Sequence, residues 1–446
     1  MRFRTLVALT GVLALSLTGC AGSDPGARSS GTVTYWLWDA NQLPAYEACA
    51  KDFEKQHRGL DVKFTQIGWE DYWTKLTASF ISGTEPDVFT NHIQKFGQFA
   101  DLQVLEPLDD LGMKDTDYQP GLAANWVAQD GHRYGAPKDW DTVSLFYNKK
   151  MLDDADLTPK DLDGLRWNPK DGGTFEKAIA HLTVDRNGKR GDEPGFDKHK
   201  VKTYGLATNG AGDGDGQTQW SPFTGSAGWS YTDKKRWGDE YRYGDKTFQS
   251  VIEWYFGLAK KGYMAPFTAW NAGLNQSNAQ FAAGRAATAF DGAWMLSTYA
   301  GFKGIDFGTV RNPTGPTGKR ATMMNGLADS VTKGARNKAG AKKWVAYMAS
   351  DACQRTVGRY GIVFPATPSG TDTAVAAYKK KGIDTSAFTT PVDDRKQYRT
   401  FPFPITNYAA DVYALMHPAM QDVFGNGAPA RRLDETNDQI NLLLDQ

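Results

Sequence analysis

The 446-residue sequence has few cysteines, no net charge and no long apolar run after its first twenty residues. Three cysteines are too few for a disulfide-based scaffold or a clustered thiolate metal site. The 51 basic residues balance the 51 acidic ones, so the chain lacks the basic face that binds nucleic acid or an anionic membrane surface. No later stretch reaches the roughly 18 apolar residues of a membrane-spanning helix.

Familiar catalytic and metal-binding motifs are also missing. The six histidines are scattered, without the paired spacing of a zinc enzyme. Residues 315–320 (GPTGKR) depart from the spacing of a phosphate loop, and residues 225–228 (GSAG) are not a nucleophile elbow. Two loops, 185–188 (DRNG) and 213–216 (DGDG), leave open either a calcium site or solvated turns. Neither loop continues with the full spacing of calcium ligands, so we predict no metal and no cofactor.

Aromatic residues are abundant. The chain has 14 Trp, 19 Tyr and 23 Phe, more than a core needs, and such rings suit stacking on the apolar faces of a ligand. A hydrophobic share of 40% and a charged share of 23% exclude general disorder. At about 150 residues per domain, the length predicts two or three domains.

The N-terminus is typical of an exported protein. Arg2 and Arg4 precede an apolar run at 6–17, which is too short to span a bilayer and typical of a signal peptide. The run ends in Leu-Thr-Gly-Cys, which resembles the bacterial lipobox, with Cys20 as the lipidated first residue of the mature chain. We therefore expect a lipoprotein signal peptide at 1–19 and a lipidated Cys with a flexible tether at 20–31.

The next segment predicts alternating strands and helices. Strands are expected at 32–38, 61–67 and 87–90, with helices at 44–57 and 69–81 between them. This β-α-β-α-β order predicts an α/β fold with parallel strands and right-handed crossovers. Ligands of such sheets bind beyond the carboxyl ends of the strands. Those ends carry Trp38-Asp39, Gly68-Trp69-Glu70 and Asn91-His92.

Several segments, taken in order, resemble the extracellular solute-binding proteins of bacterial ABC sugar importers, the family that includes maltose-binding protein. The likeness covers nearly all of residues 31–446. The segments that carry it are 83–88 (GTEPDV), 105–109 (LEPLD), 134–137 (YGAP), 145–152 (LFYNKKML), 281–294 (FAAGRAATAFDGAW), 306–313 (DFGTVRNP) and 361–365 (GIVFP). The family usually has Met where this chain has Thr288.

The resemblance implies a two-lobe, type II periplasmic-binding-protein-like α/β fold, with parallel-rich sheets flanked by helices and a multi-strand hinge. We expect the first lobe to comprise 31–139 plus 311–351, and the second 140–310 plus 352–446. The chain would cross the hinge near 138–141, near Val310 and near Asp351. Cys49 and Cys353 then lie in or beside the first lobe, and the sequence leaves open whether they are bonded or remain buried thiols.

Binding a neutral sugar needs polar groups for its hydroxyls and aromatic rings for its faces. At the first-lobe strand ends we predict Trp38, Asp39, Glu70 and Asn91, and at the first crossing Asp141. From the rest of the chain we predict Trp220, Trp229, Asp291, Trp294, Asn325, Gly326 and Arg359. Trp220 and Trp229 are the stacking candidates, and Arg359 would donate a charged fork.

The resemblance implies a protein on the outer face of the cytoplasmic membrane, held there by its lipid anchor. It would capture a neutral sugar or oligosaccharide and deliver it to the permease subunits of an ABC transporter. We expect a monomer that is not an enzyme. Two alternatives remain open: a secreted, lipid-anchored glycoside hydrolase, which needs two carboxylates facing one bond, and the same fold binding a non-sugar solute.

Overall fold

The computed structural model describes residues 31–210, 213–266 and 276–446. The predicted signal peptide, Cys20 and nearly all of the tether lie outside these residues. Within them, eleven strands form one hydrogen-bonded sheet in the order β2-β1-β3-β9-β4-β7-β6-β5, with β8 and β10 also paired to β4 and β11 to β9. The strands are β1 (Gly31–Leu37), β2 (Leu60–Gln66), β3 (Val88–His92), β4 (Ala136–Asn148), β5 (Val184–Asp185), β6 (Val201–Leu206), β7 (Ala286–Gly292), β8 (Phe307–Val310), β9 (Arg320–Val331), β10 (Phe364–Pro365) and β11 (Tyr398–Phe401).

The first lobe begins with the predicted β-α-β-α-β segment, which is confirmed. β1 runs parallel to both β2 and β3. The connecting helices are α1 (Leu43–Gln56) and α2 (Trp69–Ser82), and α3 (Ile93–Asp101) follows β3. α1 has Pro at its first turn, where no N–H is needed. α2 ends at Gly83, whose φ of 64° suits a residue without a Cβ.

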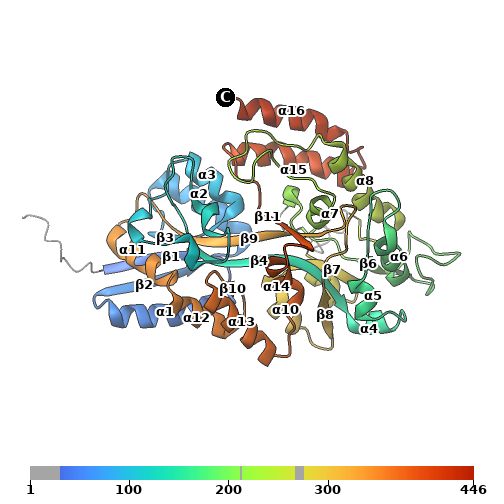
Figure 1. Ribbon diagram of the computed structural model, residues 1–446, viewed down its shortest axis with the longest axis horizontal. Coiled ribbons are helices and arrows are strands. Elements are labelled where there is room, and N and C mark those ends of the chain that lie inside the picture. Colours follow the sequence, from blue (N-terminus) through green and yellow to red (C-terminus); the bar gives the residue numbers. More distant parts are fainter. Residues whose placement is uncertain (1–30, 211–212, 267–275) are drawn as a thin grey trace, which may run out of the picture.

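Two long strands, β4 and β9, connect the lobes and run across the middle of the molecule (Figure 1). They pair antiparallel from Ala136 opposite Asp329 to Thr142 opposite Met324. Beyond that point β4 leaves β9 and pairs with β7 and β8 of the second lobe. All thirteen residues of β4 are buried. The shared strands therefore form the hinge region, and the mixed α/β architecture is the expected two-lobe fold.

The second lobe surrounds the other half of the sheet. β7 pairs parallel with β6, which pairs antiparallel with β5. Two C-terminal helices pack against each other on this side of the molecule (Figure 1). The helices of this lobe are α4 (Lys149–Asp153), α5 (Pro159–Asp163), α6 (Gly173–Leu182), α7 (Ser221–Ser226), α8 (Lys246–Lys261), α9 (Ser277–Ala282), α10 (Leu296–Ala300), α14 (Ser386–Asp393), α15 (Ala409–Gly425) and α16 (Arg432–Leu444).

The third passage of the chain between the lobes differs from the expectation. We expected it near Asp351, with 352–446 in the second lobe. Instead, α12 (Asp351–Tyr360) packs against α1 and against α13 (Pro368–Lys380) on the first-lobe side. The chain reaches the second-lobe part of β9 only at β11, which runs parallel to it from Arg320 to Met323.

Burial on α12 explains this placement. Cys353 and Val357 belong to the same buried cluster as Cys49 and Phe53 of α1, and α11 (Lys338–Met348) contributes Trp344 to it. The structure has a disulfide between Cys49 and Cys353. Because this apolar face must be covered, α12 stays with α1, and the crossing is displaced beyond α13. Among the described residues, no helix is long and apolar enough to span a membrane.

Candidate functional site

Aromatic side chains gather where β1 and β3 end and α2 begins. Trp38 lies 5.2 Å from Trp69, 5.1 Å from Tyr72 and 5.3 Å from Trp73, measured between ring centroids. His92 lies 5.7 Å from Trp69 and completes the set, which we call the first-lobe aromatic cluster. Trp69 is 40% exposed, so its ring offers a surface to a ligand. Convergence at the carboxyl ends of these strands is the arrangement expected of an open α/β sheet.

The polar residues predicted at these strand ends have different surroundings. Glu70 is exposed beside Trp69. Asp39 accepts hydrogen bonds from the backbone N–H of Asn41 and the side chain of Gln42, so it stabilises the turn before α1. Its carboxylate is therefore already engaged by the protein.

Asn91 lies outside the aromatic cluster. It is buried, and its Nδ2 donates to Ser330 Oγ across the β3–β9 pair at 3.1 Å. Successive residues of a strand point to opposite faces, so its neighbour His92 takes the place at the cluster. The sequence placed both residues at this strand end. Because β3 is buried on both faces, its sequence does not alternate between polar and apolar residues, and it could not indicate which of the two faces the ligand.

Asp141 and Asn325 lie opposite each other on the hinge strands. They are register partners of β4 and β9, and Asn325 Nδ2 is 3.3 Å from Asp141 Oδ2. The same Nδ2 is 3.0 Å from His92 Nε2, which connects the hinge pair to the first-lobe aromatic cluster. Burial, reinforced by the nearby Asp139 carboxylate, raises the pKa of Asp141 well above its ordinary value. Asp141 Oδ1 and Asn325 Oδ1 are buried and accept no hydrogen bond from the protein.

Gly326, the next residue of β9, permits a close approach of the chain. A Cβ at this position would lie 2.5 Å from Leu122 Cδ1 and 3.2 Å from Asp139 O. The glycine therefore allows β9 to pack tightly here, beside the hinge pair.

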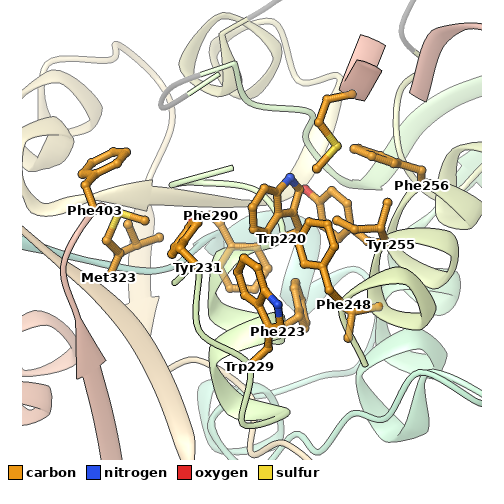
Figure 2. Packing of buried hydrophobic residues seen from close by; sticks show 14 of the residues in the cluster. Trp220, Phe223, Trp229, Tyr231, Phe248, Tyr255, Phe256, Phe290, Met323 and Phe403 are labelled. Carbon is orange, nitrogen blue, oxygen red and sulfur yellow. The ribbon is translucent and has the colours of Figure 1, made fainter. Parts of the chain in front are cut away.

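Trp220 and Trp229 were expected to stack on the ligand, but the structure buries both rings. They are 1% and 4% exposed and belong to a packed aromatic cluster in the second lobe (Figure 2). The ring of Phe248 stacks on Trp229 at 4.4 Å and meets the edge of Trp220 at 5.1 Å. Trp229 Nε1 donates to Arg242 O. The Gly-rich loops thus fold back and use both rings in the core.

Asp291 is also engaged within the second lobe. Its carboxylate accepts hydrogen bonds from Ser277 Oγ at 2.5 Å, Tyr299 Oη at 3.1 Å and Gly292 N at 3.0 Å. Burial raises the pKa of Asp291 to about 6, and the hydrogen bonds oppose this shift. Trp294 is half-buried, and its ring lies over Gly292 so closely that a Cβ there would be 1.7 Å from Trp294 Cζ3.

Arg359 is exposed on α12. Its Nη2 donates to Thr356 Oγ1 one turn earlier in the same helix. Since α12 packs with α1 and α13, the structure does not bring Arg359 to the hinge pair. The displaced third crossing accounts for this difference from the prediction.

Other contacts connect the first lobe with the second lobe. Gln94 Nε2 donates to Asp215 Oδ2 at 2.7 Å, and Trp237 Nε1 donates to Val127 O at 2.9 Å. Phe403, which precedes α15, lies 5.4 Å from the His92 ring. A cavity beside these contacts is lined by Gln94, Lys95, Gln98, Gly214, Asp215, Tyr241, Pro404, Ala409, Val412, Tyr413 and Met416. Sequence reasoning named only Gly214 and Asp215 among them, as part of a possible calcium loop, because segments far apart in the chain build the surface.

The described residues contain no group of three or more His, Cys, Asp or Glu arranged to hold a metal ion. In the first loop considered for calcium, Asp185 accepts hydrogen bonds from the backbone N–H groups of Asn187, Lys189 and Asp197. Its carboxylate oxygens thus stabilise a turn. In the second loop, Asp215 binds Gln94, while residues 211–212 lie outside the described ranges.

A family model of bacterial extracellular solute-binding proteins matches residues 48–383. The chain belongs to this family. The family is extracellular, so this solute-binding protein acts outside the cytoplasm. The resemblance proposed from the ordered sequence segments is thereby confirmed.

Two relatives of this solute-binding protein carry names that describe binding proteins. It is 25% identical over 442 residues to the maltodextrin-binding protein MdxE of Bacillus subtilis, covering 97% of this chain and 94% of the relative. It is 26% identical over 365 residues to a maltooligosaccharide ABC transporter solute-binding lipoprotein of Streptococcus pneumoniae, covering 79% and 76%. Neither name describes an enzyme.

A solved structure shares the fold of this solute-binding protein. The ABC substrate-binding protein Lmo0181 of Listeria monocytogenes, in complex with cycloalternan, superposes with a TM-score of 0.76 at 18% identity. The match covers 93% of this chain and 99% of that structure. This likeness confirms the two-lobe α/β fold.

Proposed function

We propose that this solute-binding protein captures a neutral oligosaccharide between its lobes and delivers it to the permease of an ABC transporter. The names of the two relatives make maltooligosaccharides the first ligands to test. The protein returns its ligand chemically unchanged, as a binding protein and not an enzyme.

One structural observation carries the proposal: unpaired polar atoms lie beside aromatic rings at the hinge. Asp141 and Asn325 each have one buried side-chain polar atom without a protein partner, and His92 connects Asn325 to the partly exposed ring of Trp69. Buried polar atoms without a partner are costly, so ligand hydroxyls that form hydrogen bonds with them gain binding energy. The ring of Trp69 supplies a face for the C–H side of a sugar.

The hinge strands provide a means of enclosing the ligand. Because β4 and β9 belong to both lobes, a small change in these strands alters the distance between α3 and the segment before α15. Closure of two domains around a ligand is an established motion. In this protein it would bury the sugar and strengthen its hydrogen bonds by excluding water.

Calorimetry with purified mature protein tests the proposal. A panel of maltooligosaccharides, other neutral oligosaccharides, polyols, peptides and sugar phosphates would be titrated, and melting temperatures measured in parallel. We expect a maltooligosaccharide to bind and to raise the melting temperature. Asp141→Ala should weaken binding by about 0.5–1.5 kcal/mol, the net value of a hydrogen bond to an uncharged group, because burial favours the protonated carboxyl. The matched control Asp71→Ala, at an exposed position of α2, should not change it.

Three outcomes would contradict this proposal. No response to any carbohydrate would show that the ligand class is wrong. Binding of only a peptide, polyol or phosphorylated compound would favour the non-sugar alternative. Chromatography of the recovered sugar should show unchanged ligand, and shorter products would favour the hydrolase.

We further propose that Cys20 carries the lipid that holds the mature protein, as a monomer, at the outer face of the cytoplasmic membrane. The basic start, the short apolar run and the lipobox-like Leu-Thr-Gly-Cys support this anchor. The name of the streptococcal relative as a lipoprotein agrees with it.

A further inference from the structure

His92 occupies two structural positions at once. It is the last residue of β3 and the N-cap residue of α3. Its Nδ1 accepts the backbone N–H of Gln94 at 3.1 Å, which satisfies a donor at the start of the helix. Its other ring nitrogen, Nε2, lies 3.0 Å from the side-chain amide of Asn325.

These two contacts determine which ring nitrogen of His92 carries a hydrogen. Burial, with a smaller effect of the Lys95 charge, lowers the pKa of His92 to about 3, so the neutral ring carries one N–H. The backbone N–H of Gln94 can only donate, which makes Nδ1 the acceptor and places the hydrogen on Nε2. Nε2–H in turn needs an acceptor, and the only acceptor atom of the Asn325 side chain is Oδ1.

We propose that His92 is a positioning residue of the cleft: its Nε2–H donates to the side-chain oxygen of Asn325 and so fixes which groups the hinge pair offers to the ligand. The two ends of an amide have nearly the same shape, and their assignment follows from the hydrogen-bond network. With its oxygen toward His92, Asn325 places Nδ2 where no protein group is bonded.

This orientation also determines the state of Asp141. Its Oδ2 lies 3.3 Å from the amide atom that faces His92, which is now an oxygen. Two acceptor oxygens that face each other repel unless a hydrogen lies between them, and burial already favours the protonated carboxyl of Asp141. Asp141 therefore donates to Asn325 Oδ1 and keeps Oδ1 of its own carboxyl for a ligand hydroxyl.

The ligand chemistry follows from this arrangement, and it rests on the proposed sugar-binding function. The hinge pair offers one amide donor, from Asn325, and one acceptor, from Asp141. A ligand that fits must present an acceptor oxygen and a donating hydroxyl close together. Neighbouring hydroxyls of a neutral sugar supply both, whereas an anionic group supplies only acceptors.

His92 also connects the hinge to a contact between the lobes. The ring of His92 accepts a hydrogen bond from the backbone N–H of Gln94. The side chain of Gln94 in turn donates to Asp215 of the second lobe. The imidazole therefore joins the hinge pair to the start of α3, the helix that closes against the second lobe. Misplacing the ring would disturb both at once.

The tautomer can be tested without any ligand. The ring nitrogens of His92 are observed by NMR in ¹⁵N-histidine-labelled mature protein, with the signals assigned by their loss in His92→Gln. We expect hydrogen on Nε2 and a bare Nδ1. Hydrogen on Nδ1, or a charged ring at neutral pH, would overturn the proposal whether or not the protein binds a sugar.

Two substitutions separate positioning from capping. The amide nitrogen of Gln reaches about where Nε2 lies, whereas the amide of Asn is near Nδ1 and is itself a good N-cap. His92→Gln should keep the affinity for the best oligosaccharide of the panel within about threefold, and His92→Asn should lower it about tenfold, the size of one net hydrogen bond. The melting temperature should change in the opposite order, with the larger decrease in His92→Gln.

His199→Gln, at an exposed position, is the matched control and should leave both quantities unchanged. Equal losses of affinity in the two His92 variants, or losses that follow the melting temperature, would show a merely structural role and refute the proposal. If the wild type binds no sugar, the proposed function fails, and the NMR measurement alone decides the role of His92.

Discussion

Cys49 in α1 and Cys353 in α12 are joined by a disulfide, with their Cα atoms 5.4 Å apart, although the two residues are 304 positions apart in the sequence. Both residues are only 1% exposed. The bond fastens a late helix to the first helix of the chain. It therefore keeps α12 in the first lobe, although the chain could have crossed the hinge before this helix.

Removing this disulfide should destabilise the protein. Cys353→Ala is expected to lower the free energy of unfolding by about 2–5 kcal/mol, because the unfolded chain loses a long closed loop. Denaturation with and without a reducing agent measures the loss. The double variant Cys49→Ala/Cys353→Ala should lose about as much as the single one, and a reducing agent should not affect it. Additive losses would contradict a bonded pair.

Trp69 and Trp229 should respond in opposite ways to replacement by Ala. Trp69→Ala should weaken oligosaccharide binding by about 1–3 kcal/mol, because a ring available to the ligand is lost, with little change in melting temperature. Trp229→Ala should cost about 3–5 kcal/mol of stability, as expected for a large side chain in a packed core. Calorimetry and thermal unfolding distinguish the two. A loss of affinity in Trp229→Ala at unchanged stability would instead support the prediction from the sequence that Trp229 stacks on the ligand.

Gly97 in α3 should control how closely the lobes approach. A Cβ there would lie 2.4 Å from Thr406 O, in the segment that follows Phe403. We expect Gly97→Ala to weaken binding and to reduce the ligand-induced decrease of the radius of gyration in solution scattering. The same change at Gly257, in α8, has open space around it and serves as the control. An unchanged compaction in Gly97→Ala would show that this contact does not limit closure.

Asp291 should make stability fall as the pH rises. Its pKa is raised from 3.8 to about 6 in the folded protein, so the folded state holds a proton that the unfolded chain releases earlier. Its contribution is full below about pH 4 and is lost as the pH rises through about 6, a change of about 3 kcal/mol at 1.36 kcal/mol per unit. Wild type and Asp291→Asn should therefore differ in slope between these values. Parallel curves of unfolding free energy against pH would contradict the shift.

Cys20 should determine where the protein is found. Cys20→Ala should move it from the membrane fraction to the medium or to an unprocessed precursor. Cell fractionation and N-terminal sequencing test this. Unchanged membrane retention with a correctly trimmed N-terminus would contradict the anchor.

Local patterns in the sequence were sufficient for much of the fold. The alternation of short strands and helices from 32 to 90 predicted the first half of the first lobe because each element carries its own apolar period. Asp141 and Asn325 were chosen on separate grounds, and the structure makes them neighbours in register on β4 and β9. The sequence of either strand alone does not reveal which residues of the other strand it pairs with.

Some expectations differ from the structure, and in these cases contacts between distant segments decide where a residue lies. Trp220 and Trp229 lie in Gly-rich loops that look exposed, yet Phe248 of α8 covers both rings. Arg359 was expected to donate to the ligand, yet it lies on α12, whose buried face packs in the first lobe. His92 was visible at its strand end, but its role depends on Asn325, 233 positions away. The spacing of apolar residues within one helix or strand carries no information about such contacts.

The hinge strands have a consequence for the order in which the chain can fold. β4 finds its partner β9 only after most of the sequence has been made, since Asp141 and Asn325 are 184 positions apart. The first lobe also waits for α12 and α13, and the second for β11, α15 and α16. Neither lobe can therefore be completed before the C-terminal part of the chain is present. Because such distant pairings form slowly, the chain should remain unfolded for longer than one whose contacts are mostly local.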